Sequence, residues 1–144
     1  MALPVPRPGL VIRYGFLWCE DAARGHEEGD KDRPCAVVLT TRTRHGETVV
    51  TVLPITHTPP HNLDLAVEIP VATKRRLGLD DDRSWIVVTD ANRFIWPGPD
   101  LRPRRPGDAS SVAYGLLPAA LLEAVRDKLI KAIEARRATV APRS

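Results

Sequence analysis

The sequence predicts a mainly β protein of the α+β class: a small barrel or strongly bent sheet of six or seven short strands, with a C-terminal amphipathic helix packed on it. The chain has 144 residues and 14 prolines. A helical bundle cannot absorb so many, because each proline removes a backbone donor and clashes with the preceding turn. Short runs rich in β-branched and aromatic residues recur between turn signals before residue 118. A single long helical pattern follows them.

The β-forming runs place the strands. They are expected at 10–18, 36–41, 48–55, 65–69, 85–89, 93–96 and 112–114. The strands 36–41 and 48–55 should form a hairpin, because His45-Gly46 between them is a turn sequence. Asp90-Ala91-Asn92 is a good turn sequence as well. The polar segments 19–32 and 97–111 lack periodicity and are expected to be loops.

Two segments have helical character. Val71 to Leu77 is long enough for one or two turns, closed by Gly78. From Pro118, a residue that suits the first helical position, apolar residues recur at helical spacing with basic residues outside. This pattern predicts one amphipathic helix of about 20 residues. We expect one domain over 1–144, with its core at about 9–137 and a frayed tail at 138–144.

The composition favours a cytoplasmic protein without a membrane segment. No run of about 18 apolar residues is present, and residues 1–9 lack the charged and then apolar layout of a signal peptide. Cys19 and Cys35 lie outside any CxxC pair, which favours reduced structural thiols.

The net charge of +3 is unevenly distributed along the chain. Residues 19–32 carry six acidic side chains against two basic ones, and residues 102–144 carry nine basic side chains against four acidic ones. Such asymmetry suits contact with a polyanion or an acidic partner, and charge alone fits a plain solvated surface at least as well.

No metal site or cofactor is expected. His57 and His61 have a spacing that places two imidazoles on one face of a helix, but Pro59 and Pro60 between them prevent that helix. The sequence contains no HExxH, P-loop, GxGxxG or GxSxG motif.

Polar residues at strand ends are the remaining candidates for chemistry. Arg33-Pro34 leads into the strand at 36–41, and Thr56 follows the strand at 48–55. If these strands pair as a hairpin, both side chains lie at one end of the sheet. A plainer alternative makes Arg33 an ion-pair partner of Asp30 or Asp32, and Thr56 an edge hydroxyl.

The order of these pieces resembles the PemK/MazF family of toxins from type II toxin–antitoxin modules. The resemblance covers about residues 9–135 and rests on the following segments: Gly25-His26-Glu27-Glu28, Lys31-Asp32-Arg33-Pro34, the strand AVVL at 36–39, Val52-Leu53-Pro54-Ile55-Thr56, Leu77-Gly78-Leu79, Trp85 to Asp90, and the final helix. Its most specific parts are the Arg-Pro that leads into an apolar strand and the Pro-x-Thr that ends the next one.

The resemblance implies an SH3-like β-barrel, usually a homodimer, that cleaves single-stranded RNA without a metal ion. It also implies a cognate antitoxin with an acidic disordered segment. Arg33 matches the family's catalytic arginine and Thr56 its catalytic threonine, while Glu27 falls near an acidic loop residue. Two departures stand out, since the loop at 19–32 is longer than usual and His57 replaces a small hydroxyl residue.

The implied chemistry fits the residue types. Attack of the RNA 2′-OH on the adjacent phosphate needs a base, stabilisation of the phosphorane and protonation of the leaving oxygen. A guanidinium suits phosphate oxygens, so Arg33 would stabilise charge, with proton donation as a second role, and Thr56 would position the phosphate or the 2′-OH. Glu27, His26 and His57 are candidates for substrate contact and for the base, which the sequence leaves open; an imidazole has the most suitable ordinary pKa, about 6.5.

Other interpretations remain at this point. Trp18, Trp85 and Trp96 are able to stack on bases, although two of the three are expected in the core or an interface. The cluster Arg102 to Arg105 either tracks the RNA backbone or forms a solvated loop. A barrel toxin that poisons DNA gyrase through its C-terminal residues, or a plain interaction module, would need neither Arg33 nor Thr56.

Overall fold

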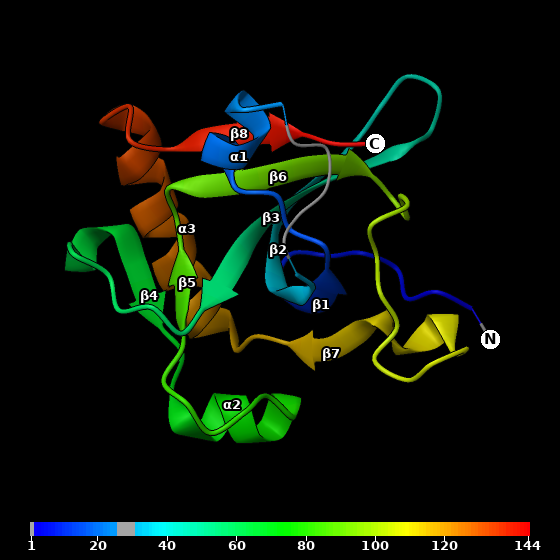
Figure 1. Ribbon diagram of the computed structural model, residues 1–144, viewed down its shortest axis with the longest axis horizontal. Helices are drawn as coiled ribbons and strands as arrows, with labels where there is room; N and C mark the ends of the chain where they lie inside the picture. Colours follow the sequence, from blue (N-terminus) through cyan, green and yellow to red (C-terminus); the bar gives the residue numbers. More distant parts are fainter. Residues whose placement is uncertain (1, 26–30) are drawn as a thin grey trace.

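The computed structural model describes residues 2–25 and 31–144. The strands are β1 (Leu10–Tyr14), β2 (Arg33–Arg42), β3 (Thr48–Thr56), β4 (Ala66–Glu68), β5 (Trp85–Val87), β6 (Asp90–Ile95), β7 (Ala113–Leu116) and β8 (Thr139–Pro142). The helices are α1 (Cys19–Ala23), α2 (Val71–Leu77) and α3 (Ala119–Glu134), with 3₁₀ turns η1 (Leu63–Leu65) and η2 (Ala109–Val112). Within the described residues the strands form an eight-stranded sheet in the order β4-β5-β3-β2-β1-β7, with β6 beside β3 and β8 beside β6 (Figure 1).

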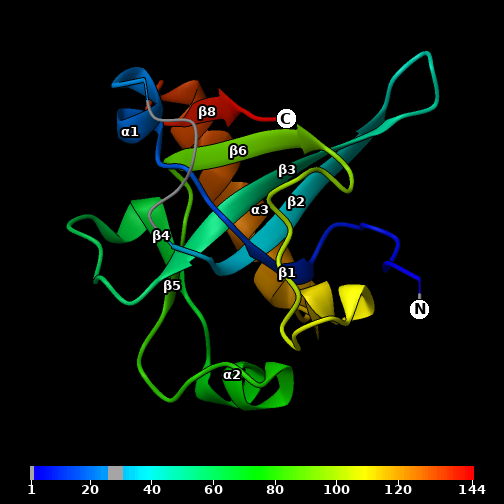
Figure 2. The same cartoon turned by 45° about the vertical axis from the view of Figure 1, so that its right-hand side comes forward.

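β3 gives the sheet its barrel-like bend, because its two halves have different neighbours on one edge. Val49–Val52 pair with β6, whereas Ile55 and Thr56 pair with β5. On its other edge β3 pairs with β2 in an antiparallel hairpin that includes Cys35 opposite Pro54. The turn of this hairpin projects away from the body of the molecule, while the opposite ends of β2 and β3 lie next to β5 (Figure 2).

The buried side chains of the described residues fall into two clusters on the two faces of the sheet. Alternation along the strands explains the division: Val11 and Ala36 face one cluster, and Ile12 and Val37 face the other. The first cluster packs against α3, which crosses behind the sheet in Figure 1. The second is rich in aromatic side chains, including a stacked pair of Tyr14 and Phe94 with centroids 4.6 Å apart.

The predicted fold class is confirmed: the protein is mainly antiparallel β with a helix near the C-terminus. The predicted hairpin is present, and α2 covers 71–77 with Gly78 in the left-handed region at φ +72°. The described residues contain eight strands rather than six or seven. None of the described helices is long and apolar enough to cross a membrane.

Two local predictions were wrong. Part of the expected loop at 19–32 forms the short helix α1, whose first turn is acidic and which carries an ion pair of 2.6 Å between Glu20 and Arg24. The expected turn at 90–92 is the first half of β6. The Asn92 side chain is buried and bonds both the backbone N–H and the carbonyl of Leu17, so a typical turn residue serves here as a core polar group.

The expected frayed tail at 138–144 was also wrong. α3 ends at Glu134, and the chain then returns as β8, which pairs in parallel with β6. The register places Asp90 beside Thr139 and Arg93 beside Pro142. The Arg143 side chain is 4% exposed and forms an ion pair of 3.0 Å with Asp100. The C-terminal segment is therefore part of the sheet.

Candidate functional site

The ends of β2 and β3 bring together three of the predicted site residues. β2 begins at Arg33 and β3 ends at Thr56, each two residues beyond the Cys35–Pro54 pair of the hairpin. A pocket of about 290 Å³ opens there. Its walls are residues 31–34 of β2 and the preceding loop, residues 55–58 at the end of β3, and Leu79, Asp80 and Ser84 of the loop after α2. Arg33, Thr56 and His57 therefore share one cavity.

Arg33 is held by stacking rather than by a carboxylate. Its guanidinium carbon lies 5.1 Å from the centre of the Trp18 ring, and its Nε is buried without a hydrogen-bond partner. The predicted alternative of a pair with Asp32 is wrong, because Asp32 instead lies 3.5 Å from Arg102 and 3.9 Å from Arg13. No carboxylate of the described residues forms an ion pair with Arg33, while Asp30 lies outside them. The cation therefore keeps capacity for an anion.

Thr56 is fixed by its own turn. Its Oγ1 accepts a hydrogen bond of 3.2 Å from the backbone N–H of Thr58, and its backbone pairs with Trp85 on β5. The hydroxyl has one donor and two acceptor positions, so its O–H remains able to donate. The strand end thus presents an oriented hydroxyl in the wall of the pocket.

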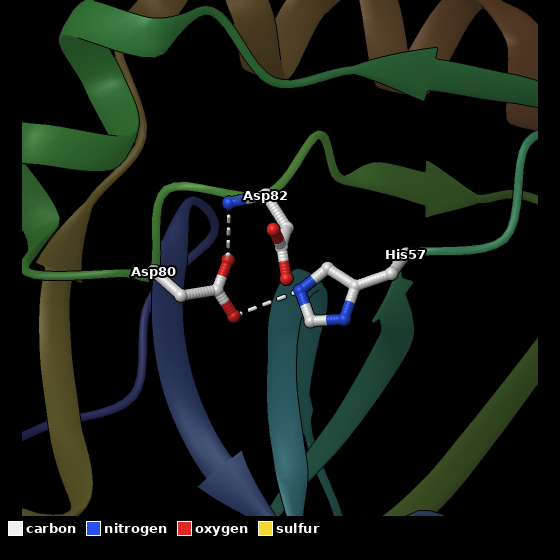
Figure 3. A group of neighbouring side chains, drawn as sticks. All are labelled: His57, Asp80 and Asp82. Carbon is white, nitrogen blue, oxygen red and sulfur yellow. Dashed lines mark hydrogen bonds and ion pairs between the residues drawn. The ribbon is translucent and has the colours of Figure 1, made fainter.

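His57 belongs to a chain of three side chains. Its Nε2 lies 2.8 Å from Oδ2 of Asp80, and Oδ1 of Asp80 accepts a bond of 2.9 Å from Nζ of Lys74 (Figure 3 shows His57, Asp80 and Asp82). Lys74 is a buried residue of α2, whereas the side chains of His57 and Asp80 are 53% and 54% exposed. The hydrogen bond from Lys74 is the main reason that the pKa of the Asp80 carboxyl lies below its ordinary value.

The same group has the residue types of a metal site. One ligand atom each from His57, Asp80 and Asp82 lies within 4.8 Å of the others. However, the Lys74 ammonium already bonds Oδ1 of Asp80 and the backbone carbonyl of Asp82. A divalent cation would meet this fixed positive charge at its side and compete with it for Asp80. The contacts are those of an ion-pair network.

Neither cysteine is arranged as a nucleophile. Both thiols are free, and burial raises the pKa of each, since desolvation disfavours a thiolate. Cys35 lies fully in the second core cluster.

The tryptophans and the arginine cluster, which the sequence offers for contact with RNA, differ in their surroundings. Trp85 is buried, and Trp18 and Trp96 both pack against the second core cluster. Of the three, Trp18 contacts the guanidinium of Arg33, which lines the pocket. In the arginine cluster, Arg104 lies over the Tyr114 ring and Arg105 pairs with Asp108. Side chains of this cluster are thus engaged within the chain.

His26 and Glu27 lie outside the described residues, so their predicted contact with substrate stays a prediction. The sequence reasoning missed Lys74 and Asp80. The only signal was a run of three aspartates, Asp80 to Asp82, just after the Gly78 that closes α2. Which of the three would meet a lysine depends on how the loop folds back.

Comparison with models of known protein families identifies the family of this chain. A model of the PemK-like, MazF-like toxins of type II toxin–antitoxin systems matches residues 12–94, which is more than half of the chain and includes the ends of both β2 and β3. Searches of curated proteins and of solved structures give no significant match. The chain therefore belongs to the PemK-like, MazF-like toxin family of type II toxin–antitoxin systems.

Proposed function

We propose that this toxin is a metal-independent endoribonuclease that cleaves single-stranded RNA by attack of the 2′-OH on the adjacent phosphate. The observation that carries the proposal is the pocket in which Arg33 and Thr56 meet. It combines a guanidinium that no described carboxylate engages with a hydroxyl fixed by its own turn. These are the groups that a phosphoryl-transfer site needs for charge stabilisation and for positioning.

Each group has one role in this proposal. The Arg33 fork donates to the non-bridging oxygens of the scissile phosphate and stabilises the negative charge that grows on them. The Thr56 hydroxyl donates to the phosphate or to the 2′-OH and fixes the line of attack. The 2′ oxygen forms a bond to phosphorus, the bond to the 5′ oxygen breaks, and the products are a 2′,3′-cyclic phosphate and a 5′-OH.

Single-stranded RNA is the proposed substrate, because in-line attack requires a flexible backbone and an unpaired nucleotide that is able to enter the pocket. Lys31 in the same wall adds positive charge for the neighbouring phosphate. Glu27 and His26, which precede Lys31 in the sequence, are proposed to contact the substrate as well.

The partners follow from the family. A type II toxin has an antitoxin, and we propose that this one binds through an acidic disordered segment, which suits the net charge of +3 and the nine basic residues of 102–144. We propose a homodimer, an SH3-like arrangement of the barrel and a cytoplasmic location on the same basis.

The test is cleavage of labelled single-stranded RNA in EDTA, with analysis of the product ends. We expect fragments that carry a 2′,3′-cyclic phosphate and a 5′-OH. Thr56→Val should lower the rate about 10²-fold, whereas Thr56→Ser keeps the hydroxyl and should retain most of it. A wild-type protein that leaves RNA of varied sequence uncut, or products with a 5′-phosphate, would contradict the proposal.

A further inference from the structure

His57 is the residue whose surroundings the proposed reaction leaves unexplained. It follows Thr56 directly and lines the same pocket. Its ring is half exposed, so it is accessible to a ligand, yet it is held by a hydrogen bond to Asp80 rather than left in solvent. This combination of access and fixed orientation is typical of a group that transfers a proton.

The contact with Asp80 decides which nitrogen is free. Asp80 is an acceptor when ionised, so Nε2 at 2.8 Å carries the proton in the neutral ring and Nδ1 carries the lone pair. Figure 3 shows Nδ1 on the side of the ring away from the Asp80 carboxylate. In the described part of the chain Nδ1 has no hydrogen-bond partner.

Asp80 is itself held in place by a buried lysine. The three donors of the Lys74 ammonium meet Oδ1 of Asp80, the carbonyl of Asp82 and the hydroxyl of Ser84. The backbone N–H of Asp82 also donates to Oδ1 of Asp80 at 3.2 Å. All donors of a buried cation are thereby satisfied, and the carboxylate has little freedom to leave His57.

We propose that Nδ1 of His57 is the general base of the RNA cleavage, and that Asp80 and Lys74 are its positioning residues. The inference rests on the proposed function. In the step, Nδ1 takes the proton of the 2′-OH while the 2′ oxygen bonds to phosphorus and the bond to the 5′ oxygen breaks. The 5′ oxygen takes a proton from a water molecule in the open pocket, and the hydroxide that remains takes the proton from His57. No oxidant, reductant or metal ion is required.

Charged groups lie around the ring on both sides of the pocket. Asp80 and Asp82 face it from the loop after α2, with Lys74 behind them. Lys31, Asp32 and Arg33 face it across the pocket from the β2 side. A base must be neutral to act, so the cleavage rate should rise with pH along an acidic limb and then level off.

The experiment compares single-turnover cleavage by wild type, His57→Gln and Asp80→Asn from pH 4.5 to about 9. His57→Gln should lower the plateau rate about 10²-fold or more and abolish the acidic limb. Asp80→Asn should lower the plateau rate, because it weakens the contact that orients the ring. The matched controls are His45→Gln, in the hairpin turn at the far end of β2 and β3, and Asp81→Asn, which changes the same charge one residue away; both should retain the wild-type profile.

A readout independent of activity tests the positioning role. Nitrogen-15 NMR of the protein with labelled histidine should show the proton of neutral His57 on Nε2 in the wild type. Asp80→Ala should weaken this preference and Asp81→Ala should leave it unchanged. If the tautomer is the same in all three proteins, Asp80 does not position the ring.

The outcomes separate this inference from the proposed function. If His57→Gln cleaves with the wild-type rate and profile while Arg33→Ala is inactive, the base assignment is overturned and the ribonuclease remains. The base assignment is also overturned if the acidic limb survives in His57→Gln. It is overturned as well if the wild-type rate falls with rising pH and His57→Gln loses that fall. If the wild type cleaves no RNA, the proposed function fails and the assignment fails with it.

Discussion

Arg33 stacks on Trp18, with the guanidinium carbon 5.1 Å from the centre of the indole ring. The ring in turn meets Phe16 edge to face at a centroid distance of 5.3 Å, and Phe16 is buried in the second core cluster. A cation in the wall of the pocket is thus connected to the core by two aromatic side chains. Because Arg33 lacks an ion pair with the described carboxylates, this stacking fixes its position without neutralising its charge.

Removing the stacking surface should impair cleavage without unfolding the protein. We predict that Trp18→Leu lowers kcat/KM for RNA cleavage about 10-fold, in line with 1–2 kcal/mol for a partly desolvated cation–π contact, and that Trp18→Phe has a smaller effect. Steady-state kinetics and circular dichroism provide the measurements. Equal activity of Trp18→Leu and wild type would show that Arg33 does not depend on the ring.

The C-terminal ion pair should contribute to stability. Arg143 bonds Asn92 and the carbonyl of Gly15, and pairs with Asp100, all in a poorly exposed position. We predict that Arg143→Met lowers the free energy of unfolding by about 3 kcal/mol, because Asp100 is left without its buried partner. Urea denaturation measures this. Arg137→Met, at an exposed residue just before β8, should change stability by about 0.5 kcal/mol or less; equal effects of the two would contradict the role of Arg143.

The position of β8 in the sheet affects how a gyrase-binding toxin is distinguished from a ribonuclease. Deletion of residues 138–144 is a clean test only if the tail is free, but the deletion removes β8 and Arg143. We predict that the truncated protein unfolds at lower temperature than wild type, as measured by thermal denaturation. Loss of toxicity on truncation would then report loss of fold, so the substitutions at Arg33 and Thr56 are the better discriminator.

The Lys74–Asp80 bond should make stability depend on pH in the acidic range. The pKa of Asp80 is lowered in the folded protein, so the bond stabilises the fold above the ordinary carboxyl range near pH 4 and this contribution is lost as pH falls below it. We predict that wild type exceeds Asp80→Asn by about 1 kcal/mol or less at pH 7, since Asp80 is half exposed, and that the gap closes towards pH 3. Urea denaturation at each pH tests this. A gap that widens on acidification would contradict the assignment.

Metal removal should leave the reaction intact. Lys74 already supplies positive charge to the Asp80 carboxylate and to the backbone carbonyl of Asp82, beside the cluster in which a cation would otherwise bind. We predict equal cleavage rates in EDTA and in millimolar Mg²⁺ or Mn²⁺ once ionic strength is matched. If Mn²⁺ stimulates the wild type but not Asp82→Asn, the three-residue cluster is a metal site after all.

The sequence predicted those parts of the fold that depend on local patterns. Alternating apolar residues located the hairpin, and Gly78 marked the end of α2. The meeting of Arg33 and Thr56 in one pocket was predictable, because they lie at adjacent ends of two strands that pair as a hairpin. β8 was missed because a parallel strand is defined by a distant partner, here β6, and Thr139–Pro142 carries no periodic signal of its own. The sequence around Asn92 predicts a turn, because the burial of this residue depends on Leu17, 75 residues away.

Cleavage of labelled single-stranded RNA in EDTA by wild type, Arg33→Ala and Arg33→Lys tests the central claim most directly. We predict that the wild type produces 2′,3′-cyclic phosphate ends, and that Arg33→Ala is slower by about 10³-fold with an unchanged circular dichroism spectrum. Arg33→Lys should recover only a small part of the rate, since an ammonium keeps the charge but loses the planar fork that fits a phosphate. Cleavage by Arg33→Ala at the wild-type rate, or no cleavage by the wild type, would contradict the assignment of this pocket as a ribonuclease site.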